Sequence, residues 1–114
     1  MKYLLLIHST TARARYAELD EDEQNAITRE YFALTEEPGM LGSAQLQRAE
    51  TATTVRVENG RVLTTDGPFV ESKEELGGYY LYEADNLDAA LELAARIPAA
   101  RMGGAIEVRP LMEH

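Results

Sequence analysis

The sequence predicts an α+β domain in which two β-α-β halves share one antiparallel sheet, with a β-hairpin inserted between them. Two stretches with apolar residues at helical spacing, 20–37 and 86–97, are each flanked by short β-prone runs. An Asn-Gly pair between two alternating runs marks the hairpin. The 114 residues amount to a single domain, large enough to form a core without disulfides.

The first half begins with the apolar run Tyr3 to His8, which has the length of a central strand. A polar connection over 9–18 follows and leaves room for one helical turn. Asp20 is predicted to cap the first helix together with the residue three positions later, a capping-box spacing. Pro38-Gly39 predicts that this helix ends near Glu37, because neither residue continues a helix well.

A second strand and a hairpin follow in the middle of the chain. Leu41 to Gln47 is predicted to be a strand in which Gly42 marks a bulge. Residues 54–58 alternate between polar and apolar, and residues 61–64 return as the partner strand. Asn59-Gly60 between them predicts a type I′ turn, in which both central residues need a positive φ.

The second half is predicted to hold a strand, a helix and a last strand. Tyr79 to Ala84 is β-prone and aromatic, and Asp85 or Asn86 would cap the helix that follows. Pro98 is expected to end that helix, and Ala105 to Pro110 alternates as the last strand. The predicted apolar stripe of the helix consists of Leu87, Ala90, Leu91, Ala94 and Ile97.

This order of elements describes a ferredoxin-like domain with helices on one face of the sheet. The open face would carry apolar side chains from Leu4, Leu6 and the tyrosine-rich strand. A domain of this size cannot cover that face with its own residues. Pairing of two sheets face to face in a homodimer is the simplest remedy.

Composition limits the classes of function. The net charge of −9 repels phosphate backbones and anionic membranes, so we expect neither nucleic-acid nor membrane binding. The apolar N-terminal run is too short for a secretory signal, which favours a soluble cytoplasmic protein. The chain has no Cys, and its His are His8 and the C-terminal His114, so no His-rich metal centre and no cofactor are predicted.

Turn formers, charges and an aromatic residue crowd together over residues 64–78. This stretch resembles the signature of the DGPF-type branch of the YCII-related family. The resemblance covers nearly the whole chain and is carried by Met1 to His8, Thr65-Asp66-Gly67-Pro68-Phe69, Glu71, Lys73-Glu74, Leu76-Gly77-Gly78-Tyr79-Tyr80, residues 94–98 and residues 107–110. It implies a dimeric α+β barrel of ferredoxin-like protomers. It also implies association with an alternative sigma factor, beside which DGPF-type members commonly occur.

Asp66 and His8 are the candidate acid–base residues. Asp66 begins an Asp-Gly-Pro turn, where its carboxylate either accepts backbone N–H groups or, if burial raises its pKa, acts as a general base at a pocket mouth. His8 is the one non-terminal group that titrates near neutrality without help. For each residue a purely structural role is the alternative, because no nucleophile signature accompanies them.

Lys73, Phe69 and Tyr80 are the candidate ligand contacts. Lys73 could bind a carboxylate, or pair with the glutamates around it. Phe69 could stack on a ligand, or fill the core or the dimer seam. Tyr80 could hydrogen-bond a small ligand or pack in the core. Ser72 and Glu75 have the spacing of a capping box for a short helical turn.

Two functional hypotheses follow. In the first, the dimer binds a small organic molecule between sheet and helices and catalyses a cofactor-free isomerisation or elimination. In the second, it is a non-catalytic accessory or ligand-sensing module linked to an alternative sigma factor. A closed apolar cavity that holds Asp66 would favour the first, and a filled core with an exposed apolar or acidic patch would favour the second.

Overall fold

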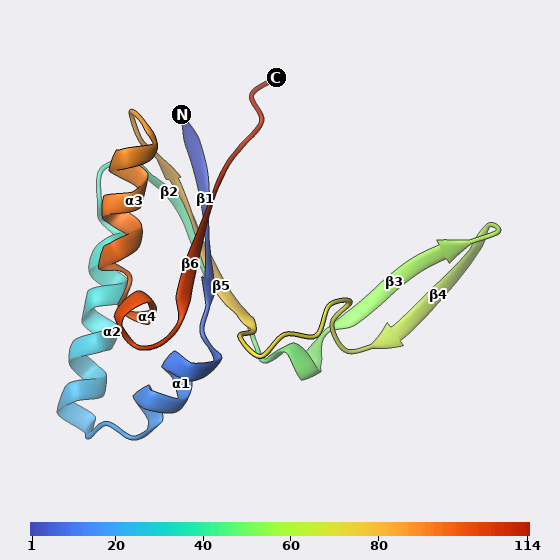
Figure 1. Cartoon of the computed structure of the whole chain (residues 1–114), viewed down its shortest axis with the longest axis horizontal. Helices are drawn as coiled ribbons and strands as arrows, with labels where there is room; N and C mark the ends of the chain where they lie inside the picture. Colours follow the sequence, from blue (N-terminus) through green and yellow to red (C-terminus); the bar gives the residue numbers. More distant parts are fainter.

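The computed structural model describes residues 1–114. Figure 1 shows a sheet with helices on one side and a hairpin that projects from the other side. None of the helices combines the length and the apolar character that crossing a membrane requires. The elements in chain order are β1 (Lys2–His8), α1 (Thr10–Ala17), α2 (Glu21–Thr35), β2 (Met40–Gln45), the 3₁₀ turn η1 (Ala49–Thr51), β3 (Thr53–Glu58), β4 (Arg61–Asp66), β5 (Leu76–Glu83), α3 (Leu87–Arg96), α4 (Pro98–Arg101) and β6 (Ala105–Pro110).

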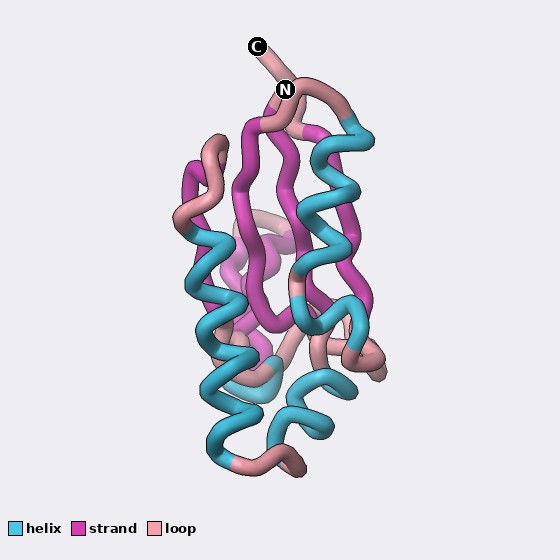
Figure 2. The backbone as a smooth tube through the Cα atoms, turned by 90° about the vertical axis from the view of Figure 1, so that its left-hand side faces the viewer, coloured by secondary structure: helices cyan, strands magenta, loops and turns pink.

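Four strands form the main sheet in the order β2-β5-β1-β6, and every neighbouring pair is antiparallel. With the separate β3–β4 hairpin set aside, this is the order of a ferredoxin-like sheet, so the predicted fold class is confirmed. In Figure 2 the helices lie in front of one face of the sheet. The pairing of β2 with β5 shifts register between Met40 and Gly42, which confirms the predicted bulge.

Side chains along β1 point alternately to the two faces of the sheet. Tyr3, Leu5 and Ile7 are buried against the helices, whereas the residues between them are only partly buried. Leu4 and Leu6 therefore face the side that the helices leave open. On β5 their partners are Leu81 and Tyr79, so the open face is apolar as predicted.

The hairpin forms as its sequence predicts. Asn59 and Gly60 have φ values of 50° and 77°, the positive values that a type I′ turn requires. Thr53 pairs with Asp66 and Glu58 with Arg61, so the strands extend slightly beyond the predicted runs. The two strands hydrogen-bond only to each other and to no strand of the larger sheet.

Two local predictions were wrong in part, and one short helix was not predicted. Residues 10–17 form a full helix where one turn was predicted, because a distant carboxylate caps its start. The predicted stripe of α3 is wrong at Leu87 and Leu91, which are about half exposed. The buried residues of the helix are Ala90, Leu93 and Ala94, and Ile97 is buried directly after it. α3 ends at Arg96 with an extended Ile97, as Pro98 predicts. Pro98 itself begins the short helix α4, which was not predicted, because a first-turn proline loses no hydrogen bond.

Candidate functional site

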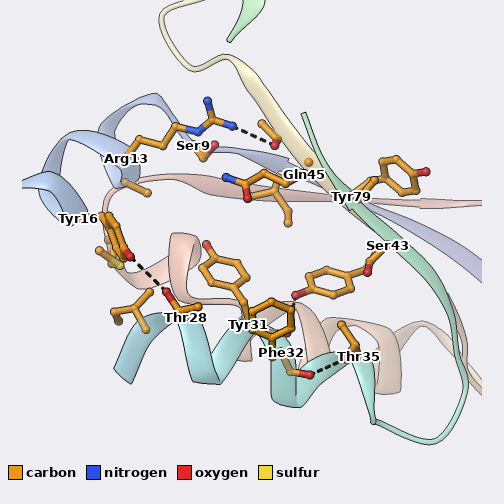
Figure 3. Close-up of a pocket in the computed structure, with 18 residues that line it drawn as sticks. Ser9, Arg13, Tyr16, Thr28, Tyr31, Phe32, Thr35, Ser43, Gln45 and Tyr79 are labelled. Carbon is orange, nitrogen blue, oxygen red and sulfur yellow. Dashed lines mark hydrogen bonds between the residues drawn. The ribbon is translucent and has the colours of Figure 1, made fainter. Parts of the chain in front are cut away.

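A cavity lies between the helix-covered face of the sheet and the helices α1 and α2 (Figure 3). Its volume of about 450 Å³ lies in the range of small-molecule sites. Tyr16, Tyr31 and Phe32 lie on the helix side, whereas Ser43 and Gln45 come from β2. The other lining residues are Ile7, Ser9, Ala12, Arg13, Ile27, Thr28, Thr35, Ala44, Gly77, Gly78, Tyr79, Tyr80 and Met102.

Arg13 is the only charged residue in this lining. Its Nη2 donates to the carbonyl oxygens of Leu46 at 2.8 Å and Gly77 at 3.1 Å. It makes no ion pair, although the chain has 20 acidic residues. Backbone carbonyls satisfy some of its N–H groups but do not neutralise its charge, so Arg13 brings a positive charge to this end of the cavity.

The residues after the Asp-Gly-Pro turn hold α1, the helix that carries Arg13. The Glu74 carboxylate accepts hydrogen bonds from the backbone N of Thr11 at 3.2 Å and from its hydroxyl at 2.7 Å. The backbone N of Glu75 donates to the Thr10 hydroxyl at 2.7 Å. A carboxylate at the first turn of a helix satisfies free N–H groups and complements the helix dipole. This part of the motif therefore positions the cavity wall.

Glu75 also anchors the base of the hairpin and does not cap a helix. Its carboxylate accepts hydrogen bonds from Arg48 and from the backbone N of Ala49. These bonds, the Arg48 contact first, lower the pKa of Glu75. Ser72 bonds to Glu74, one residue short of the predicted partner, and residues 72–75 form no helical turn. The capping-box prediction is therefore wrong.

The buried Tyr80 and the partly buried Tyr31 both line the cavity. The Tyr80 hydroxyl donates to the Tyr31 carbonyl at 2.9 Å, and the Tyr31 hydroxyl accepts from the backbone N of Ala99 at 3.2 Å. Burial raises the pKa of Tyr31, and burial followed by the nearby Tyr31 raises the pKa of Tyr80 to about 12. Both stay protonated at neutral pH. The Tyr31 O–H has no protein acceptor, so it is a free hydrogen-bond donor for a ligand.

We expect the stability to fall steeply at alkaline pH because of Tyr80. Its pKa is raised from about 10 in the unfolded chain to about 12 in the fold. The contribution of the protonated Tyr80 phenol to the free energy of unfolding is complete below about pH 10. This contribution is lost as the pH rises toward about 12. Urea denaturation across this range should show a loss of about 1–2 kcal/mol. Tyr80→Phe should flatten that fall, whereas Tyr79→Phe on the other face of β5 should retain it; equal slopes would contradict the assignment.

The candidate acid–base residues lie away from this cavity. Asp66 ends β4 at the base of the hairpin and is exposed. His8 lies on the open face of the sheet, where its Nε2 is 3.1 Å from a Glu107 carboxylate oxygen. No contact joins Asp66 to His8, and neither lines the cavity. Within one copy of the chain they do not form the predicted acid–base pair.

Of the predicted ligand contacts, only Tyr80 lines the cavity. Lys73 is exposed and makes no ion pair. Phe69 is 70 % exposed, and its ring lies 5.4 Å from the guanidinium carbon of Arg56. The expectation that Phe69 fills the core is therefore wrong for a single copy. No three His, Asp or Glu side chains come together in a way that could hold a metal ion.

The sequence prediction missed Arg13 and Gln45. Arg13 lies in a stretch that reads locally as a polar connection, and Gln45 lies in a weakly alternating strand. Only the pairing of β2 with β5 and the docking of α1 beside Gly77 bring them to one cavity. Their partners are more than thirty residues away in sequence, so no local pattern could have identified them.

The model of the YCII-related domain matches this chain over residues 1–114. The chain belongs to the YCII-related domain family. An uncharacterised protein of Rhizobium meliloti (strain 1021) is 36 % identical over 118 residues, covering 97 % of this chain and 92 % of that protein.

A solved structure with the same fold is the 5-chloro-2-hydroxyhydroquinone dehydrochlorinase of Burkholderia phenoliruptrix AC1100, in complex with 2,5-dihydroxybenzoquinone. This YCII-related chain superposes on it with a TM-score of 0.53 and 14 % identity, covering 100 % of this chain and 96 % of that one. At this level of identity the similarity establishes the fold alone.

Proposed function

We propose that this YCII-related protein binds a small aromatic molecule with an anionic oxygen in the cavity beneath α1 and α2. The observation that carries the proposal is Arg13, an unneutralised cation at the edge of a cavity with no other charge. An anionic oxygen would complete the coordination of its guanidinium through charge-assisted hydrogen bonds.

The shape and chemistry of the remaining lining support an aromatic ligand. Ten of the 18 lining residues are hydrophobic, which favours a ligand with an apolar body. Phe32 is 68 % exposed beside the cavity, and covering such a ring with a planar ligand would remove apolar surface from water. The free O–H of Tyr31 would donate to a second oxygen of the ligand. The complex of the dehydrochlorinase holds a ligand of this class, 2,5-dihydroxybenzoquinone.

A panel of probes tests the proposal. Benzoate and 2,5-dihydroxybenzoquinone should raise the melting temperature in proportion to the logarithm of their concentration, as expected for ligands that bind the folded state. Benzyl alcohol, an uncharged probe of similar size, should have a much smaller effect. Equal shifts from the charged and uncharged probes would overturn the proposed role of the anionic oxygen.

Homodimer formation through the open sheet face is part of the proposal. The apolar face formed by Leu4, Leu6, Tyr79 and Leu81 supports it, since a second sheet would remove that surface from water. Sedimentation of the protein should give twice the mass of 12.7 kDa.

The Asp66-Gly67-Pro68-Phe69 motif supports assignment to the DGPF branch of the family.

A single copy of the chain does not bring an acid–base residue to the cavity, so catalysis would need a second copy. The cavity lining contains no carboxylate or imidazole, and the phenols of Tyr31 and Tyr80, whose pKa values are raised, are poor bases near neutrality. A second copy would have to complete the site if Asp66 and His8 act as acid and base in an isomerisation or elimination. The same holds for Lys73 and Phe69 as ligand contacts. Asp66→Asn in the intact dimer should then abolish any turnover while leaving probe binding unchanged.

The second hypothesis uses the same cavity without turnover. A ligand-sensing module that accompanies an alternative sigma factor would bind the probes and convert none of them. Binding without conversion, together with capture of the sigma factor only in the presence of a probe, would favour this function over catalysis.

A further inference from the structure

We infer that the β3–β4 hairpin is an arm that packs its apolar face against a second copy of this chain. The inference rests on the proposed homodimer and adds to it a contact outside the main sheet. The hairpin forms a sheet of its own and projects away from the rest of the chain (Figure 1). An isolated two-stranded hairpin is only marginally stable in water, so this one needs a surface to pack on.

The valines of the hairpin gather on one face, and most of its charged side chains lie on the other. Residues directly opposite each other in an antiparallel pair share a face, so Val57 and Val62 lie on the same side as Val55. The other side carries Arg56, Glu58 and Arg61, together with Leu63, which is 43 % exposed. The three valines are 61 %, 65 % and 68 % exposed in the order Val55, Val57, Val62, so nothing in one copy covers them. Exposed valines gathered on one face of a hairpin mark a contact surface.

The direction of the hairpin identifies the second copy as the occupant. The helices cover one face of the sheet, and the hairpin projects on the opposite side, where the apolar open face lies (Figure 1). A second sheet packed on that face would lie about 10 Å away, whereas strands of six residues extend about 20 Å. The arm is therefore long enough to pass the edge of the partner's sheet and lie along it.

Charge is compatible with this contact. Residues 53–66 contain two arginines (Arg56 and Arg61) and two acidic residues (Glu58 and Asp66), so the arm is neutral in a chain of net charge −9. It can approach an equally acidic copy without the like-charge repulsion that two acidic surfaces would have.

The arm would also bring Asp66 to the interface. Asp66 follows Val62 and Thr64 at alternate positions of β4, so it lies on the same face as the valines. Packing of that face on a second copy places this carboxylate against the partner.

Thiol labelling of single-cysteine variants tests the arm, because the natural chain contains no cysteine. Val57→Cys and Glu58→Cys are neighbours on opposite faces of β3. In the dimer, the Val57→Cys thiol should react with Ellman's reagent about tenfold more slowly than the Glu58→Cys thiol, because a covered site reacts only through opening. Dilution below the dissociation constant of the dimer should remove the difference. The pair Val55→Cys and Arg56→Cys repeats the test if the first variant misfolds.

Each outcome decides a separate point. Equal labelling rates at the two cysteines, in a protein that sedimentation shows to be a dimer, would contradict the packing of the hairpin but not the dimer. A single-copy mass at all concentrations would overturn both. Benzoate binding at Arg13 is measured independently of either result, so loss of the arm cannot be mistaken for loss of the proposed ligand site.

Discussion

Replacement of Arg13 by Gln should weaken the binding of benzoate by about 10- to 100-fold, because a hydrogen bond to a charged group contributes about 1.5–3 kcal/mol. Gln retains hydrogen-bond donors on a shorter side chain but carries no charge for an anion. Arg13→Lys keeps the charge without the planar fork, so its affinity should be intermediate. Isothermal titration calorimetry gives the affinity of each variant.

Arg48 provides the matched control for this experiment. It is exposed and forms an ion pair with Glu75, and it does not line the cavity. Arg48→Gln removes the same charge from the same side of the molecule, so benzoate affinity should change by less than about twofold once salt screens long-range effects. A loss as large as that of Arg13→Gln would show that net charge, and not the cavity, attracts the probe.

Gly77→Ala should destabilise the fold by about 1–3 kcal/mol, the usual cost of an overpacked site. A Cβ at this position would overlap the hydroxyl of the buried Ser9 and lie 3.1 Å from Arg13 Nη2. The Ser9 hydroxyl must move out of the way, and the Arg13 guanidinium, which binds the proposed anion, must also shift slightly. We therefore expect Gly77→Ala to lower both the free energy of unfolding, measured in urea, and the affinity for benzoate.

Gly42→Ala tests whether the effect comes from this clash or from any glycine in a strand. No atom lies within 4 Å of a Cβ built at Gly42, and its φ is not positive. Alanine has less backbone freedom than glycine in the unfolded chain, so it loses less entropy on folding. The free energy of unfolding should therefore stay the same or rise by about a few tenths of a kcal/mol. An equal loss in both variants would contradict the proposed role of Gly77.

Much of the fold was predictable because its signals are local. Asn59-Gly60 fixes the hairpin turn, Asp20 accepts the hydrogen bond of the Glu23 backbone N as an N-cap, and Asn86 does the same for Ala89. Each of these signals depends on residues within a few positions. Alternation along β1 and β5 likewise identified the open apolar face.

The cavity was not predictable in the same way because its walls meet through distant contacts. Thr11 and Glu74, which together fix the start of α1, are 63 residues apart. The prediction placed chemistry at the most distinctive motif, whereas the structure places Glu74 and Glu75 in roles that hold α1 and the hairpin base. A distinctive motif can therefore support a site without belonging to it.

The structure combines features that had been expected of two different functions. There is a cavity for a small molecule, but Asp66 does not line it. There is also an exposed apolar surface, but it lies on a neutral hairpin and not on an acidic patch. Binding is supported by one copy of the chain, whereas catalysis depends on what a second copy adds.

The most direct measurement is a crystal structure of the protein with 2,5-dihydroxybenzoquinone bound. We expect the ring between Phe32 and Gln45, with one oxygen within hydrogen-bond distance of the Arg13 guanidinium and another near the Tyr31 hydroxyl. A ligand bound only at the Asp66 turn, with the cavity beneath α1 and α2 filled by protein side chains, would contradict the proposed site.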